Sequence, residues 1–305
     1  MRKLFASIVF TLFIVYTGDF LLSERLWDNS AYSYSGNIRK LHYECTGIDE
    51  DFIIFGSSRC NYHYAPSIIA DTLGCSVYNA GWNGTRIVSH YYLLQQILAV
   101  HTPKYICLDI TPSDYAAEQN PFKELLQYAP CFGRVPRADS IFRDSGDYPA
   151  LCASRLYRYN ANMQSYIHAL LFHQNQPDDD NGFIPLAETE AESRLSPSDQ
   201  TPVTCDSLKL RYLEQFVQEC RKKQIQLFFS ISPLYSTATD DMYEPAVRIA
   251  DKYDIPVFNY HTRRLFHNDS SYFRDSYHLC KKGAYAFSSI FAHEMKQYIH
   301  SHTEE

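Results

Sequence analysis

DFIIFGSSR, residues 51–59, is the stretch around which the rest of the chain is organised. Four apolar residues, all β-branched or aromatic, lead straight into a glycine and two serines. A short apolar run that ends in a turn signal is typical of a strand buried on both faces. Residues 61–73 then predict a helix. The serine pair is therefore expected at the carboxyl end of a central parallel strand, where open α/β sheets bind ligands. We interpret Ser58 as a catalytic nucleophile.

The composition is that of a globular protein and excludes several classes of function. Of 305 residues, 45% are hydrophobic and 21% charged, which is enough for a large core. The net charge of −7, without a block of Lys or Arg, gives a nucleic-acid role no electrostatic support. The nine cysteines are scattered and include no C-x-x-C pair. The acidic loop at 177–182 lacks the spaced carboxylates of a calcium loop. We expect neither a metal nor a cofactor.

The N-terminus predicts attachment to a membrane. Arg2 and Lys3 precede an apolar run over 4–16, which continues through residues 17–22. A cationic start before such a run is typical of a signal sequence or signal anchor. No Ala-x-Ala cleavage site follows, so we favour an uncleaved anchor over 1–24 rather than a cleaved signal. The positive end stays in the cytoplasm, and the bulk of the chain is expected on the periplasmic side or in the cell envelope of a bacterium.

Strands alternate with helices over most of the remaining chain. After a polar linker at 25–50, a single domain is expected over 51–300, interrupted by a mostly helical insertion at about 115–202. Long insertions of this kind are typically functional, as lids or substrate walls. The alternation predicts a three-layer α/β/α fold with a doubly wound, parallel, five-stranded sheet of flavodoxin-like type. The expected strands are 52–55, 76–79, 105–110, 225–231 and 256–258, and the expected helices are 61–73, 87–100, 161–173, 207–222, 241–253 and 281–298.

A serine nucleophile needs a base, and the base needs a third group to fix its tautomer. Asp275 and His278 are three residues apart in a turn after the last strand, at the sheet edge where Ser58 is expected. The carboxylate can accept from Nδ1 of the imidazole while Nε2 faces Ser58. An oxyanion also needs preorganised donors. Gly81 and Gly84, after the second strand, offer N–H groups with no side chain in the way.

These segments resemble the conserved blocks of the SGNH (GDSL-like) hydrolase superfamily. Residues 55–58 resemble its first block, 79–84 its second and 275–279 its fifth, and the likeness covers about 52–114 and 207–298. The resemblance implies that Ser58 is the nucleophile, His278 the base and Asp275 its orienting carboxylate. It also implies that the N–H groups of Ser58 and Gly84 form part of the oxyanion hole. No G-x-S-x-G occurs, so the nucleophile-elbow hydrolases fit poorly.

Two positions depart from that pattern. Ser57 stands where the first block has an acidic residue, and Ser113 stands where the third block supplies an asparagine amide to the oxyanion. The loss of one such donor costs about 10²-fold or more in rate. Ser113 itself, Asn83 or a residue of the insertion are the candidates to compensate. Arg59, directly after the nucleophile, is a further candidate for substrate binding.

An anchored, exported chain of this type is similar to envelope proteins that move acyl groups onto polysaccharides beside membrane-bound O-acyltransferases. The expected function is that of a serine-dependent acyl-ester hydrolase or O-acyltransferase, acting on an acylated carbohydrate or a small ester. Both activities share an acyl-enzyme and differ only in the acceptor. The alternative is a non-catalytic SGNH-fold envelope protein that binds a glycan or a membrane acyltransferase partner.

Overall fold

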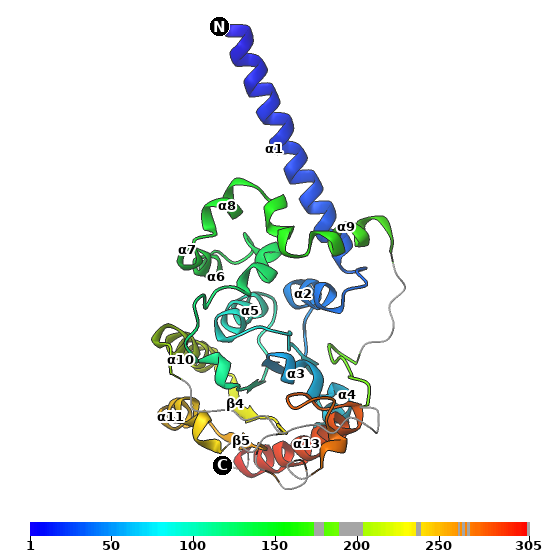
Figure 1. Cartoon of the computed structure of the whole chain (residues 1–305), viewed down its shortest axis with the longest axis vertical. Coiled ribbons are helices and arrows are strands. Elements are labelled where there is room, and N and C mark those ends of the chain that lie inside the picture. The colour runs from blue at the N-terminus through cyan, green and yellow to red at the C-terminus, as the bar shows by residue number, and fades with distance from the viewer. Residues whose placement is uncertain are drawn as a thin grey trace. The chain divides into compact units, whose positions relative to one another are not determined.

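The computed structural model (Figure 1) describes residues 1–173, 180–188, 204–235, 239–261, 263, 266 and 269–303. Part of the acidic loop at 177–182 and the end of the predicted insertion lie outside these residues. The chain forms two compact units. The first consists of Met1–Ile48, Gln95–Val100 and Phe122–Pro177, and the second consists of Asp49–Leu94, His101–Pro121 and Asp178–Glu305.

A five-stranded parallel sheet forms the centre of the second unit, in the order β2-β1-β3-β4-β5. The chain passes from β1 to β2 on one side and then crosses to β3 on the other. This reversal confirms the doubly wound sheet and places a topological switch point at the carboxyl end of β1, where such folds bind ligands. The strands are β1 (Phe52–Gly56), β2 (Val77–Asn79), β3 (Tyr105–Asp109), β4 (Gln226–Ile231) and β5 (Val257–Asn259).

Helices cover both faces of the sheet, which confirms the three-layer α/β/α fold. Phe52 and Ile54 point into a cluster formed with α3 (Ser58–His63), α4 (Pro66–Leu73) and α13 (Lys281–Thr303). Phe55 points to the other face and packs edge-on against Phe216, at 5.4 Å between ring centroids. Phe216 belongs to α10 (Ser207–Lys222), and α5 (Ile87–Val100) and α11 (Glu244–Lys252) lie beside α10.

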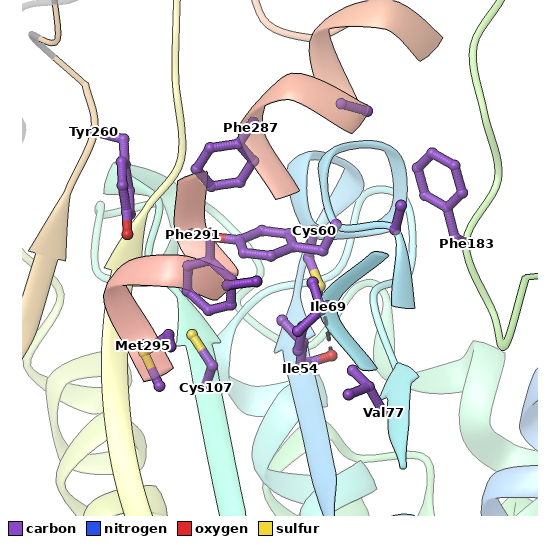
Figure 2. Close-up of a cluster of buried hydrophobic side chains, with 14 of the residues drawn as sticks. Ile54, Cys60, Ile69, Val77, Cys107, Phe183, Tyr260, Phe287, Phe291 and Met295 are labelled. Carbon is purple, nitrogen blue, oxygen red and sulfur yellow. Dashed lines mark hydrogen bonds between the residues drawn. The ribbon is translucent and has the colours of Figure 1, made fainter. Parts of the chain in front are cut away.

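The cluster on the α13 face fixes the position of α3. Figure 2 shows Phe287, Phe291 and Met295 of α13 directed toward the strands, with Met295 beside Cys107 of β3. These side chains are fully buried, and each contributes about 1.5–3 kcal/mol through the hydrophobic effect. Cys60 of α3 is buried in the same cluster, and its thiol donates to the carbonyl of Ile54 at 3.4 Å. The first turn of α3 is therefore held against β1.

The helix predicted at 61–73 is two helices in the structure. α3 ends at His63, and Tyr64 and Ala65 adopt extended backbone before α4 begins at Pro66. Proline disfavours the helical conformation in the residue before it and lacks the N–H that a continuous helix needs. The break leaves α3 as a short segment that carries residues 58–63 across the carboxyl end of β1.

Residues 25–50, expected to be a linker, are mostly helical. α1 (Arg2–Ser30) runs through the first part, and α2 (Gly36–Thr46) follows. Ile38, Leu41 and Cys45 recur at helical spacing and are buried. The many polar residues between them hid this pattern in the sequence.

Within its described residues, the insertion is mostly helical, as predicted. Its segments are η2 (Leu125–Cys131), α6 (Pro136–Asp139), α7 (Ile141–Ser145), α8 (Tyr148–Ala153), η3 (Leu156–Asn162) and α9 (Met163–Leu171). Of these segments, η3 and α9 pack against α1 in the first unit, where α9 lies beside α1 (Figure 1). The return segment 180–188 instead belongs to the second unit, where the Ile184 N–H donates to the carbonyl of Asn61 at 3.2 Å.

α1 is long and apolar enough to cross a membrane, and none of its most apolar 18 residues is buried. The exposed side chains include Leu4, Phe5 and Phe13. Because these apolar groups are exposed in the part of the chain that the structure describes, the helix fits a membrane anchor. A signal sequence has the same properties.

Candidate active site

Ser58 lies at the junction between β1 and α3, at the switch point of the sheet. β1 ends at Gly56, Ser57 is the N-cap, and Ser58 is the first residue of α3. A Cβ on Gly56 would lie 2.7 Å from the Cβ of Cys60 and 3.1 Å from that of Asp109, so only glycine allows α3 to start so close to β3. Ser57 is buried, whereas Ser58 is partly accessible. The reachable hydroxyl is therefore that of Ser58.

A continuous series of hydrogen bonds links Ser58, His278 and Asp275. The Oγ of Ser58 lies 2.8 Å from Nε2 of His278. Nδ1 of the same ring lies 3.0 Å from each carboxylate oxygen of Asp275. Because a carboxylate only accepts, the proton of the neutral ring belongs on Nδ1, and Nε2 accepts from the Ser58 hydroxyl. The structure thus brings together the three residues that the sequence analysis combined.

Asp275 is held as an ionised acceptor. Its Oδ1 accepts from the backbone N–H groups of Tyr277 at 2.8 Å and His278 at 2.9 Å, in addition to the imidazole. Partial burial raises the pKa of this carboxyl, but the hydrogen bonds from His278 and Tyr277 outweigh burial and hold the pKa below its usual value. A negative charge is therefore present beside the ring at neutral pH.

The loop that carries His278 is braced from two sides. Phe273 and Leu279 form an antiparallel bridge, and the N–H of Arg274 donates to the carbonyl of His278 at 2.8 Å. The N–H of Leu279 donates to Nε2 of His63 at 3.0 Å. His63 is buried, which together with His278 nearby lowers its pKa well below the usual value. His63 is thus a neutral acceptor that ties α3 to the loop.

Tyr62 and Asn83 form a polar edge beside the histidine. The Tyr62 ring meets the His278 ring edge to face, at 5.3 Å between centroids. The side-chain amide of Asn83 donates to the Tyr62 hydroxyl, and its oxygen accepts from Asn61 at 2.9 Å. Asn83, predicted as an oxyanion or substrate ligand, therefore uses its oxygen and one of its two amide N–H groups on protein neighbours. Tyr62 was missed because nothing in the sequence sets it apart from the other 24 tyrosines.

The two predicted oxyanion glycines differ in role. The N–H of Gly81 donates to the side chain of Asn79 at 2.9 Å, so its predicted role as a donor to substrate is corrected. A Cβ at this position would lie 2.4 Å from the backbone nitrogen of Asn61, so Gly81 permits close packing against α3. Gly84 is exposed at φ +81°, in the left-handed region that favours glycine. In the described part of the chain, its N–H has no acceptor.

Ser113 lies in η1 (Pro112–Asp114), after β3. Thr111 donates its hydroxyl to Asp114 at 2.9 Å, so the hydroxyl of Ser113, 2.7 Å from that of Thr111, donates to Thr111. Asp114 also faces His90 of α5, at 3.6 Å, and His90 binds the hydroxyl of Thr85 at 3.0 Å. These contacts join the loop after β3 to the loop that carries Gly84. Ser113 thus uses its proton within the loop.

Arg59 is a structural residue, which corrects its predicted role in substrate binding. Its side chain is buried and donates to the carbonyl of Ile110 at 2.7 Å and to the hydroxyl of Tyr243 at 3.2 Å. Its Nε lies 3.8 Å from the carboxylate of Asp109, which also accepts from Tyr64 and Ser232. Burial raises the pKa of Asp109 despite the nearby guanidinium. This buried network fastens α3 to the ends of β3 and β4.

No protein-family model matches the chain, and none of the curated proteins matches it. Among solved structures, similar chains include a lipolytic protein of the G-D-S-L family from Desulfitobacterium hafniense, at 11% identity and a TM-score of 0.41 over 80% of this chain and 98% of that one. Another is the acetyl xylan esterase AlAXEase, at 11% identity and a TM-score of 0.42. The match covers 83% of this chain and 100% of that one. A third is an acetyl xylan esterase from Butyrivibrio proteoclasticus, at 10% identity and a TM-score of 0.36. The match covers 84% of this chain and 64% of that one.

At this level of overlap the three solved proteins assign no residue of this chain a role, and the chemistry of the site rests on its own geometry. The chain is similar to solved GDSL-family lipolytic proteins and acetyl xylan esterases.

Proposed function

We propose that this chain is a serine-dependent acyl-ester enzyme, a hydrolase or an O-acyltransferase, which acts on acylated carbohydrate of the cell envelope. The observation that carries the proposal is the unbroken series of hydrogen bonds from Asp275 through His278 to Ser58. A base oriented by a carboxylate and bonded to a hydroxyl is the arrangement that activates a serine nucleophile.

The chemistry proceeds in two halves. The Oγ of Ser58 attacks the ester carbonyl carbon while its proton passes to Nε2 of His278, and Asp275 stabilises the imidazolium that forms. The tetrahedral intermediate then expels the alcohol, which takes the proton from Nε2 and leaves an acyl group on Ser58. In the second half, Nε2 of His278 removes a proton from water or from an acceptor hydroxyl, whose oxygen attacks the acyl carbon. The bond from that carbon to the Oγ of Ser58 then breaks, and Oγ takes the proton back from Nε2.

Two backbone N–H groups are assigned to the oxyanion. Ser58 is the first residue of α3, and the first N–H groups of a helix have no acceptor within the helix. Gly84 adds a second, exposed N–H on the neighbouring loop. Ser113 donates its single hydroxyl proton to Thr111, and Asn83 donates one of its two amide N–H groups to Tyr62. With these two backbone N–H groups as its main donors, the proposed oxyanion hole should give slower turnover than one with a third, fully available side-chain donor.

The exposure of the site favours a large acceptor or donor substrate. Half of the Asp275 side chain and about a fifth of the His278 side chain are exposed. A site open to this degree admits a polymer chain as readily as water. With α1 as a membrane anchor, the acceptor is a polysaccharide on the outer side of the membrane, and the acyl donor is supplied by a membrane-bound O-acyltransferase partner.

Replacement of Ser58 tests the proposal. We expect Ser58→Ala to abolish release of nitrophenol from p-nitrophenyl acetate and to prevent labelling by a fluorophosphonate probe, with the thermal midpoint unchanged. Ser57→Ala is the matched control because it removes the adjacent, buried hydroxyl, and it should retain both signals. Labelling that persists in Ser58→Ala would assign the reaction to another residue. Transfer is separated from hydrolysis by adding an oligosaccharide and measuring the share of acetyl found on sugar.

The second candidate is a non-catalytic binding protein with the same fold. One observation favours it. Ser113 and Asn83 are the candidates to replace the asparagine amide of the third block, but they donate to Thr111 and Tyr62. Such a protein would resist fluorophosphonate and would bind an acetylated glycan equally well with serine or alanine at position 58.

A further inference from the structure

The first unit contains a pocket of about 250 Å³ that the proposed esterase chemistry does not use. One wall comes from α1, which contributes Ser23, Glu24 and Trp27. The opposite wall comes from the insertion and carries three arginines: Arg134, Arg155 and Arg158. We call this site the arginine pocket.

The pocket has an excess of positive charge in a chain whose net charge is −7. Glu24 is the one acidic residue among those that line it, and Arg155 forms an ion pair with it at 2.9 Å. Among the described residues, neither Arg134 nor Arg158 forms an ion pair, although the charges of Asp19 and Asp139 act on Arg158. Asp139, which lies outside the lining, accepts from the N–H of Gly133 at 2.8 Å.

Aromatic rings and carbonyl groups fix the guanidinium groups in place. Arg134 lies over the ring of Trp27, at 4.0 Å from its centroid. Arg158 lies over Phe132, at 4.9 Å, and donates to the carbonyls of Leu151 and Phe132. A guanidinium has five N–H donors, so Arg158 keeps donors beyond those two bonds. Burial is the main cause that lowers the pKa of Arg158, and the neighbouring Arg155 lowers it further, while Tyr159 and Asp139 raise it.

The α1 wall of the pocket follows the apolar run at residues 4–18. This run ends at Asp19, whose carboxylate accepts from the Ser154 hydroxyl and from the N–H of Arg155. At a rise of about 1.5 Å per residue, Ser23 at the start of the pocket lies roughly 8 Å along the helix beyond Gly18. The headgroup region of a bilayer extends about 5–8 Å beyond each side of the hydrocarbon core. If α1 spans a membrane, the end of the arginine pocket at Ser23 therefore lies at the depth of lipid phosphates.

We propose that the arginine pocket binds a phosphate ester, with a phospholipid headgroup as its source. The planar guanidinium groups of Arg134 and Arg158 match the geometry of phosphate oxygens, and each can donate two parallel hydrogen bonds. Glu24 holds Arg155 at the rim. A soluble phosphate ester offers the same chemistry, and the probes below distinguish the two sources.

Binding to the full-length chain in maltoside micelles tests the proposal. The probes are dihexanoyl phosphatidylglycerol, dihexanoylglycerol without phosphate, and inorganic phosphate, each titrated by calorimetry. We expect the phospholipid to bind and the phosphate-free lipid not to bind. Arg134→Gln should weaken binding about tenfold or more, the effect of losing a charge-assisted contact. Inorganic phosphate that binds as tightly as the phospholipid would assign a soluble phosphate ester as the source.

Arg25→Gln is the matched control because Arg25 is exposed on the same turn of α1 but does not line the pocket. It should leave phospholipid affinity within about twofold of wild type. If Arg25→Gln and Arg134→Gln weaken binding equally, the effect arises from general surface charge, and the proposal is overturned. The proposal is also overturned if none of the probes binds.

The folding of each variant is checked by its thermal midpoint. Arg134 is exposed and makes no side-chain hydrogen bond within the described residues, so its replacement should leave the fold intact. Turnover of p-nitrophenyl acetate should be unchanged in Arg134→Gln, because Ser58 and its partners lie in the other unit. Loss of lipid binding with full turnover therefore tests this pocket independently of the proposed esterase.

Discussion

The ring of His63 accepts a hydrogen bond from the backbone N–H of Leu279, the residue that follows His278. Through this bond the helix that carries Ser58 also holds the loop that carries its proposed base. The 3.0 Å contact is buried at both ends, so neither group can exchange it for water. The relative position of the two catalytic candidates is thus set from within the site.

Removing this acceptor should impair positioning more than binding. His63→Leu leaves a buried N–H without a partner, which costs about 1–3 kcal/mol of unfolding free energy. We expect kcat on a nitrophenyl ester to fall about tenfold or more, because small misplacements of reacting groups are costly, with KM little changed. His63→Gln offers an amide oxygen in place of Nε2 and should recover most of kcat. Equal loss in the two variants would argue against positioning through this bond.

Asp275→Asn should leave the fold intact and remove most of the turnover. An amide can no longer stabilise the imidazolium, and it favours the wrong tautomer of His278, so kcat should fall on the order of 10³- to 10⁴-fold. The backbone N–H groups of Tyr277 and His278 can still donate to the amide oxygen, which preserves the loop. Steady-state kinetics measure the effect, and a loss of less than tenfold would remove Asp275 from the proposed triad.

Buried histidines should make the protein less stable in mild acid. Burial lowers the pKa of His42, His63 and His90 below the usual value. An unfolded histidine has a pKa of about 6.5, so below that pH the unfolded chain binds protons that the folded chain does not. Unfolding free energy should therefore fall as pH decreases below about 6.5, by up to about 1.4 kcal/mol per pH unit for each histidine. Denaturant titrations at several pH values measure this slope, and His63→Gln should reduce it.

Arg59→Leu should act on stability rather than on substrate binding. The variant leaves Asp109 buried without its cation, and breaking such a pair costs about 3–5 kcal/mol. Chemical denaturation should show this loss, while the folded fraction keeps the KM of the wild type. A higher KM at unchanged stability would restore Arg59 as a substrate ligand.

Ser113→Asn should increase turnover. The hydroxyl of Ser113 donates to Thr111, whereas the longer asparagine side chain carries two N–H donors toward the oxyanion. One added donor can contribute about 10²-fold, so we expect kcat/KM to increase at least about tenfold. Ser113→Ala is the control and should change turnover by less than about threefold. An asparagine variant no faster than wild type would place position 113 outside the reach of the oxyanion.

The strands and longer helices were predictable because their patterns are local. Residues 52–55 carry an uninterrupted apolar run, and the helix predicted at 207–222 has the same bounds as α10. The order of Ser58, Asp275 and His278 along the chain, each after a strand, was enough to bring them to one sheet edge. Asp275 and His278 also lie close in sequence, so their contact depends on a single turn.

The errors involve contacts between residues far apart in the sequence. Arg59 was expected to face substrate because it follows Ser58, but its partner Asp109 is 50 positions away. His63 has a structural role because it accepts a hydrogen bond from Leu279, and Tyr62 has one because its ring contacts His278. In both cases the partner is more than 200 positions away. The sequence shows that Gly81 has no side chain, which predicts an accessible N–H. It does not show that the side chain of Asn79 accepts a hydrogen bond from that N–H.

The close approach of Gly81 to Asn61 also has an evolutionary consequence. No side chain can be added at position 81 without displacing α3, and Ser58 moves with that helix. A descendant lineage would lose function through a mutation at a residue that touches neither substrate nor proton. Selection should therefore conserve glycine at position 81 as strongly as serine at position 58. Such conservation would reflect the space available beside α3 rather than a role in the reaction.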